Sequence, residues 1–230
     1  MFFGWYFDWT ILIVIPALIF TIWAQIKVST SFKKYSGVSV RNGLTGAMAA
    51  RKILDANGLH HVKIERVRGS MTDHFDPRTN TVRLSETVHD VASVAAVGVA
   101  AHEVGHAIQH AKQYFPIKVR MSVIPMTRVG SMLAMPIFLL GLLLANDMFL
   151  LIGIVLYSFV TLFQLVTLPV EFNASGRALA TLSGDKMLGD EELRGARKVL
   201  TAAAMTYVAA LASSLLSLLR LVILANNRRR

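Results

Sequence analysis

The chain has 230 residues, of which 54% are hydrophobic and only 17% are charged. Soluble globular domains carry about 25% charged residues, so this composition and a mean hydropathy of +0.51 argue against an ordinary cytosolic enzyme and exclude a disordered chain. The absence of cysteine excludes disulfides and thiolate metal sites, which leaves His, Asp and Glu as the strong metal ligands. In so apolar a chain, the net charge of +10 favours contact with an anionic lipid bilayer over nucleic-acid binding.

The N-terminal segment is predicted to be a membrane anchor. Residues 9–26 contain no charged residue and are long enough, with their flanks, to cross a hydrocarbon core of about 30 Å. Trp5 and Tyr6 precede this run and Trp23 lies near its end, as interfacial aromatic residues do. A cleaved signal peptide is the alternative, but the first 26 residues contain no Lys or Arg to form its positive n-region. Residues 1–26 are therefore interpreted as an uncleaved anchor.

The polar region at residues 27–128 is predicted to form a small α+β domain. Helical spacing, apolar–polar alternation and turn-forming residues indicate its elements. In chain order these are a helix at 46–56, a strand at 62–67, a turn at 76–80, a strand at 81–84 and a helix from about 91 to 111. Ser85 is the expected cap of the last of these helices.

The second half of the chain is predicted to return to the membrane. Two apolar runs, residues 129–145 and 148–168, are separated only by Asn146 and Asp147, which is typical of a transmembrane helical hairpin spanning 129–168. A polar segment at 169–200 follows. Residues 201–230 hold a weaker apolar run and a basic tail, and form either a further span or an amphipathic helix at the membrane surface. The fold class is therefore a mainly α membrane protein with a small α+β domain.

The distribution of basic residues predicts the orientation. Residues 27–128 hold 15 Lys and Arg, residues 177–200 hold five and the tail from Arg220 holds four, whereas residues 1–26 and 129–176 hold none. The positive-inside rule then places the N-terminus and the hairpin turn outside a cell membrane and both basic segments in the cytoplasm. Three spans and a membrane-associated helix keep Arg228–Arg230 inside, and this arrangement is the expected one.

The sequence His102-Glu103-Val104-Gly105-His106 lies on the last helix of the α+β region. Histidines four residues apart lie one turn above each other, so both imidazoles reach one ion. Glu103 then lies beside the metal, where it can take a proton from a bound water. The alternative is a pair of surface histidines around a solvated Glu, which the apolar run at 91–101 disfavours.

Zinc used in catalysis takes three protein ligands and keeps a fourth position for water. The chemically suitable third ligands are His110, Glu171, Asp185 and Asp190. His110 is eight residues from the first histidine, about 12 Å along a helix and too far to share the ion. Asp185 and Asp190 lie in a polar, Gly-containing segment typical of surface acids.

Glu171 is the preferred third ligand. It follows the hairpin within the apolar sequence Leu168-Pro169-Val170-Glu171-Phe172, where an ionisable group is costly unless it has a partner. Two membrane crossings separate it from His106, so both residues return to the same side. A role as an interfacial helix cap is the alternative.

Three stretches resemble the bacterial membrane-bound neutral zinc metallopeptidases, the YugP-like group: residues 72–77 (TDHFDP), 101–110 (AHEVGHAIQH) and 168–175 (LPVEFNAS). The resemblance implies a gluzincin-like catalytic domain, distantly similar to the heat-shock and CAAX-prenyl membrane proteases. Those proteases use a Glu as the third ligand, followed four residues later by an Asp. This chain has Ser175 at that position, so the outer carboxylate that orients a ligand is missing.

The predicted function is that of a zinc-dependent endopeptidase at the cytoplasmic membrane surface, acting on peptides or membrane proteins. His102, His106 and Glu171 hold Zn²⁺ and Glu103 is the general base. Arg177 and Tyr207 are the candidates for stabilising the oxyanion.

The strand at 81–84 is either plain sheet or the sheet edge to which an extended substrate adds.

Two other functions compete with the endopeptidase. One is an intramembrane site-2-type protease, disfavoured because only 11 uncharged residues separate Asp90 from His102. The other is a non-catalytic metal-binding membrane scaffold, which gives Glu103 no role.

Overall fold

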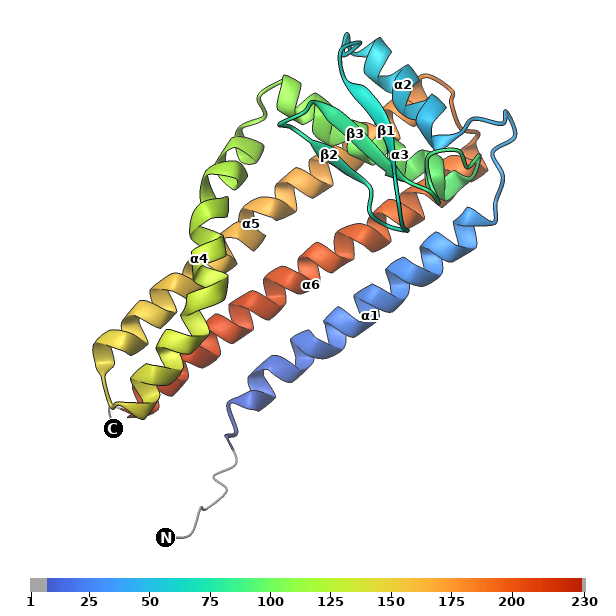
Figure 1. Ribbon diagram of the computed structural model, residues 1–230. Helices are drawn as coiled ribbons and strands as arrows, with labels where there is room; N and C mark the ends of the chain where they lie inside the picture. The colour runs from blue at the N-terminus through green and yellow to red at the C-terminus, as the bar shows by residue number, and fades with distance from the viewer. Residues whose placement is uncertain (1–7, 229–230) are drawn as a thin grey trace. The chain divides into compact units, whose positions relative to one another are not determined.

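The computed structural model describes residues 8–228, and these form six helices, one three-stranded sheet and two compact units (Figure 1). We call the first the membrane unit; its described residues are 8–23, 119–167 and 207–228. We call the second the α+β unit; it comprises residues 24–118 and 168–206. The molecule is therefore mainly helical with a small sheet. Trp5, Tyr6 and the end of the basic tail lie outside the described residues.

Four helices are long and apolar enough to cross a membrane by length and composition. They are α1 (Ile11–Ser36), α4 (Phe115–Leu143), α5 (Asp147–Gly184) and α6 (Asp190–Arg228). The predicted anchor and hairpin fall on α1, α4 and α5, and each helix extends well beyond its apolar run. In the hairpin turn, Asn146 Oδ1 accepts hydrogen bonds from the backbone N–H groups of Met148 and Phe149, which caps α5.

The last helix meets the same criteria of length and apolar composition as α1, α4 and α5, so the structure gives four candidate spans where three spans and a membrane-associated helix were expected. Its most apolar window has a mean hydropathy of 2.2, equal to that of α1. In the membrane unit it lies antiparallel to α1: Thr21 Oγ1 and Ser213 Oγ are 3.1 Å apart, and Arg220 Nη2 lies 2.6 Å from Asp8 Oδ2. Arg220 therefore lies beside the first described residues of the chain.

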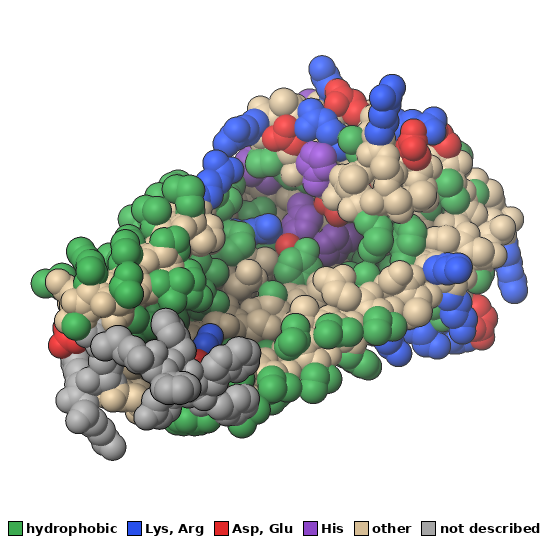
Figure 2. All heavy atoms as spheres, turned by 60° about the horizontal axis from the view of Figure 1, so that its bottom comes forward, with side chains coloured by type: hydrophobic (Ala, Val, Ile, Leu, Met, Phe, Trp, Pro, Cys, Tyr) green, Lys and Arg blue, Asp and Glu red, His purple; other side chains and the backbone are tan. Residues whose placement is uncertain are grey.

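The surfaces of the two units differ in chemistry. On the face that Figure 2 shows, hydrophobic side chains predominate on the membrane unit, and most of the Lys, Arg, Asp, Glu and His side chains lie on the α+β unit. Large apolar side chains such as Leu18, Ile19, Met132 and Leu143 are more than half exposed. Contiguous exposed apolar surface on this scale is typical of contact with lipid.

The sheet of the α+β unit has the order β1-β3-β2. Strand β1 (Lys63–Val67) is parallel to β3 (Thr81–Ser85), and β2 (His74–Asp76) is antiparallel to β3. The interpretation of the strand at 81–84 as a sheet edge is therefore wrong, because β3 is paired on both sides. Its side chains at 81, 82, 84 and 85 are buried, as those of a central strand are. The free antiparallel edge belongs to β2.

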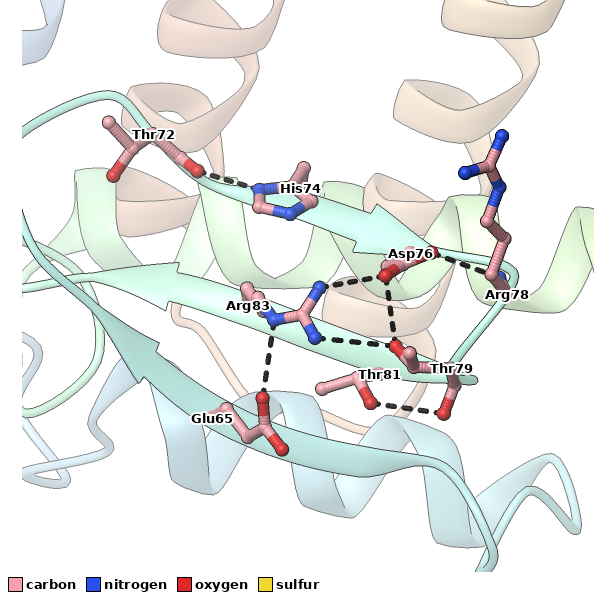
Figure 3. Close-up of polar contacts among 8 residues, drawn as sticks. All are labelled: Glu65, Thr72, His74, Asp76, Arg78, Thr79, Thr81 and Arg83. Carbon is pink, nitrogen blue, oxygen red and sulfur yellow. Dashed lines mark hydrogen bonds and ion pairs between the residues drawn. The ribbon is translucent and has the colours of Figure 1, made fainter.

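Charged side chains hold the short edge strand to the sheet (Figure 3). Arg83 on β3 lies between the other two strands, with Nη1 2.8 Å from Asp76 Oδ2 and Nε 3.2 Å from Glu65 Oε2. Asp76 also accepts hydrogen bonds from the backbone N–H of Arg78 and the Thr79 hydroxyl. These bonds lower the pKa of Asp76 to about 2. A strand of three residues thus gains a fixed register from cross-strand pairs.

Two helices cover the core of this unit. Helix α2 (Gly46–Ala56) has the predicted bounds and is capped by the Thr45 hydroxyl. Helix α3 (Val94–Ala111) is capped by Ser93, whose Oγ accepts from Ala96 N–H at 3.2 Å, so the prediction of Ser85 as the cap is wrong. The N–H and hydroxyl of Ser85 instead donate to Asp73, because a turn at 86–90 separates β3 from α3.

Candidate metal centre

Three ligand-type side chains meet on two helices of the α+β unit. His102 and His106 lie one turn apart on α3, and Glu171 lies on the part of α5 that belongs to the same unit. Glu171 Oε2 is 3.2 Å from His102 Nε2 and 3.5 Å from His106 Nε2, and one ligand atom of each residue lies within 4.8 Å of the others. The imidazoles are 14% and 13% exposed and the Glu171 side chain 3%. The cluster is shielded, yet solvent reaches it through the histidines.

The donors fit zinc. Ligand atoms around a tetrahedral zinc with bonds of about 2.0–2.1 Å lie about 3.3 Å apart. The two nitrogen–oxygen separations of 3.2 and 3.5 Å bracket that value. Two imidazoles and a carboxylate also leave one tetrahedral position for water, as catalytic zinc sites require.

Neutral side chains hold the far nitrogens of both imidazoles. His102 Nδ1 lies 3.1 Å from Ser175 Oγ, and His106 Nδ1 lies 3.0 Å from Gln109 Oε1. The fully buried Gln109 donates through Nε2 to Val170 O and Asn173 Oδ1, so its Oε1 must accept from His106. The proton of His106 is thereby fixed on Nδ1, which leaves the Nε2 lone pair directed at the cluster.

Ser175 thus lies at the position where the resemblance implies an Asp. Its hydroxyl contacts His102 Nδ1, in the place of the carboxylate that the resemblance implies. Gln109 was not recognised in the sequence. Its signal was its position three residues after His106, on the same helical face.

Glu103 lies beside the cluster on α3 and is only 9% exposed. With the residues that the structure describes, it forms no hydrogen bond or ion pair. Its charge reaches the site nonetheless. Burial lowers the pKa of His106, but the hydrogen bond that the protonated ring donates to Glu171 and the charges of Glu103 and Glu171 outweigh burial and raise that pKa overall. Glu103 therefore provides a buried negative charge whose oxygens are available to a further molecule.

The other candidate residues lie apart from this cluster. His110 contacts the Phe75 ring of β2 at a centroid distance of 5.8 Å. Asp185 follows the end of α5, and Asp190 begins α6.

Arg177 donates from Nε to Asn173 Oδ1 at 2.7 Å. It therefore supports the side-chain amides of Asn173 and Gln109, which hold His106. Tyr207 is half-buried on α6 in the part assigned to the membrane unit. Oxyanion stabilisation by Arg177 or Tyr207 stays a prediction.

A close approach of two helix backbones fixes the spacing of the ligands. A Cβ at Gly105, between the two histidines, would lie 2.7 Å from Ala174 O on α5. We expect Gly105→Ala to push α5 away from α3 and to destabilise the α+β unit by about 1–3 kcal/mol, as overpacking does. Thermal unfolding in detergent measures this. Gly176→Ala is the matched control, because a Cβ there meets no atom within 4 Å; equal melting temperatures for the two variants would contradict the prediction.

The fold and the site define a class: a membrane-associated protein with two helix-borne histidines, an adjacent Glu and a carboxylate from a second helix, which is the arrangement of a metal-dependent hydrolase. The chain belongs to the family described as "Putative neutral zinc metallopeptidase", which it matches over residues 10–226. It is also 47% identical over 219 residues to "Putative membrane protease YugP" of Bacillus subtilis (strain 168), covering 95% of this chain and 97% of that relative. No solved structure matches it. The resemblance to the YugP-like zinc metallopeptidases is therefore confirmed.

Proposed function

We propose that this protein is a zinc-dependent endopeptidase that hydrolyses peptide bonds at the cytoplasmic surface of the cell membrane. The observation that carries the proposal is the meeting of His102, His106 and Glu171 at one point, beside the buried Glu103, which has no hydrogen-bond or ion-pair partner among the described residues. The family and the Bacillus relative support the same class of activity.

The residues divide the chemistry as follows. His102, His106 and Glu171 would hold Zn²⁺, which supplies a Lewis acid for the scissile carbonyl and lowers the pKa of a bound water to about 7. The Glu103 carboxylate accepts the proton of the attacking water and then donates it to the leaving amine nitrogen. Ser175 and Gln109 keep the imidazoles in the orientation in which Nε2 faces the ion.

An extended substrate has an edge strand available close to this helix. Strand β2 has a free edge, and its Phe75 contacts the ring of His110 on the helix that carries the motif. A peptide that adds to β2 gains main-chain hydrogen bonds. We therefore place substrate pairing at β2 in place of β3.

The site-2-type alternative is not favoured. Among the described helices, α3 is not one of those long and apolar enough to cross a membrane, so its histidines are not carried by a span. A metal-binding scaffold would give Glu103 no function, although this residue is buried against the cluster at a cost in desolvation.

Labelling of introduced cysteines tests the orientation. We expect Ala145→Cys in the hairpin turn and Asn227→Cys at the end of α6 to react with an impermeant reagent in intact cells. Lys52→Cys on α2 should react only after permeabilisation, because the densest basic segment lies around it. The chain has no native cysteine, so each signal is unambiguous. Protection of position 227 with labelling of 145 would restore three spans, and labelling of 52 alone would place the site outside the cytoplasm.

A tethered substrate tests the activity and its location together. Glu171 follows the predicted hairpin by three residues, about 5 Å along a helix. We therefore expect the zinc-loaded protein to cleave one flexible sequence when it is joined to a transmembrane helix by 5 residues, at a rate within about threefold of that for a 30-residue tether. Both should be cleaved faster than the free soluble peptide. Efficient cleavage of the long tether only would contradict a site at the membrane surface, and cleavage of none would contradict the proposed peptidase.

A further inference from the structure

A cavity of about 220 Å³ lies between α5 and α6 within the α+β unit. Phe172, Ser175 and Gly176 line it on α5, and Arg197, Leu200 and Ala204 line it on α6. Pockets for drug-sized ligands measure about 300–1,000 Å³. This cavity is smaller, so its size suits one side chain better than a whole small molecule.

The cavity shares a wall with the candidate metal centre. Ser175 lines the cavity, and its hydroxyl lies 3.1 Å from Nδ1 of His102. Phe172 lines it as well and directly follows Glu171. Within α5, the buried Glu171, Ala174 and Ala178 form one stripe, and the residues that line the cavity form the adjacent stripe. A group that enters the cavity is therefore separated from a metal ligand by one side chain.

The missing side chain of Gly176 keeps this space open. Gly176 lies inside α5, where glycine costs about 1 kcal/mol relative to alanine. The close packing that explains Gly105 does not apply, because a Cβ at Gly176 meets no atom within 4 Å. No steric requirement of the fold explains this glycine, whereas an occupant of the cavity does.

The lining has a definite chemical character. Phe172 and Leu200 make it apolar, and Phe172 is 46% exposed although it lies in the α+β unit. The exposed Arg197 stands at the cavity and forms no hydrogen bond or ion pair with any residue in the range 8–228. An apolar recess beside an available guanidinium complements an apolar side chain with a carboxylate nearby.

We propose that this cavity is a specificity subsite, which takes an apolar side chain of a peptide substrate next to the scissile bond, while Arg197 pairs with an acidic side chain of the neighbouring residue. The inference rests on the proposed peptidase function. The wall that the cavity shares with the metal centre, formed by Ser175 and Phe172, assigns the cavity to the substrate, and the charge of Arg197 assigns the acidic neighbour.

Filling the cavity tests the proposal. The substrates are flexible peptides that differ at one position, Ala or Leu, and at the next, Gln or Glu. The wild-type protein should prefer Leu to Ala by about 10-fold or more, the range in which apolar pockets discriminate. Gly176→Leu should lower the ratio of kcat/KM for the Leu peptide to kcat/KM for the Ala peptide at least tenfold. Gly176→Ala should lower this ratio less. Arg197→Gln should reduce only the preference for Glu over Gln, by about fivefold, in keeping with a partly exposed charge pair.

A binding measurement separates the subsite from catalysis. In a Glu103→Gln background, the Gly176→Leu change should reduce the affinity for the Leu peptide and leave the affinity for the Ala peptide unchanged, with zinc content equal to that of the parent.

Three outcomes would contradict a proposal. An unchanged Leu-to-Ala ratio of kcat/KM in a Gly176→Leu protein that still cleaves would overturn the subsite but not the proposed peptidase. Equal loss on all peptides would mean that the cavity serves lipid or the fold. A wild-type protein that binds zinc and cleaves none of the peptides would overturn the proposed function itself.

Discussion

Glu171→Ala is expected to weaken zinc binding by more than about 100-fold. The variant loses one of three donors, and with it the only negative charge among the described residues that touches both imidazoles, at 3.2 and 3.5 Å. Loss of an outer partner alone already costs about 10–100-fold in metal affinity, so loss of a ligand should cost more. Metal content after purification and competition with a chelator measure the effect.

Three matched variants sharpen this prediction. Ser175→Ala removes the hydroxyl beside His102 Nδ1 and should weaken zinc binding by about 10-fold. Asp185→Ala and Asp190→Ala should leave metal content unchanged, because neither residue joins the cluster of ligand atoms. Full zinc content in Glu171→Ala, with loss in either Asp variant, would show that another acid completes the site.

Glu103→Gln is expected to retain zinc and to lose proteolysis by about 10²–10⁴-fold, the usual contribution of a general base. The amide has the shape of the carboxylate but cannot accept the water proton. Because Glu103 forms no hydrogen bond or ion pair with the described residues, the substitution breaks no contact that holds the helix. Stability should therefore stay at the wild-type level or rise, since a buried charge is removed.

The same variant decides between enzyme and scaffold. Peptide cleavage by Glu103→Gln at the wild-type rate, with zinc bound, would rule out Glu103 as the base. A wild-type protein that holds zinc without cleaving any peptide would favour the scaffold. Thermal unfolding of both proteins in the same detergent is the control, because it shows whether a change in activity follows from a change in fold.

Local patterns predicted the elements that depend on local forces. The helix at 46–56 has a capping Thr45 and ends before Gly58, whose φ is +72°, and both signals can be read from neighbouring residues. The hairpin around Asn146 and the face shared by His102 and His106 are equally local. The contact of Glu171 with the two histidines could be predicted from two arguments. The hairpin returns the chain to the side of His106, and a carboxylate close to lipid requires a partner.

The features that sequence reasoning missed depend on partners far along the chain. Strand β2 has only three residues and is held by Arg83, so its own sequence carries little strand signal. The central place of β3 follows from pairing with both neighbours.

Ser85 was predicted to be a helix cap because the local sequence pattern does not show its hydrogen bond to Asp73. The length of α6 became evident only from its pairing with α1, through Ser213 and Arg220.

The α+β unit is interrupted in sequence by residues 119–167, which belong to the membrane unit. During synthesis the histidine pair therefore emerges first, and Glu171 follows 65 residues after His106, once both hairpin helices have been made. At about 5–20 residues per second, a nascent chain spends several seconds with two of its three ligands. The third is delivered only by the return of α5 from the hairpin. The cluster of His102, His106 and Glu171 can therefore be complete only after the whole membrane hairpin has been synthesised.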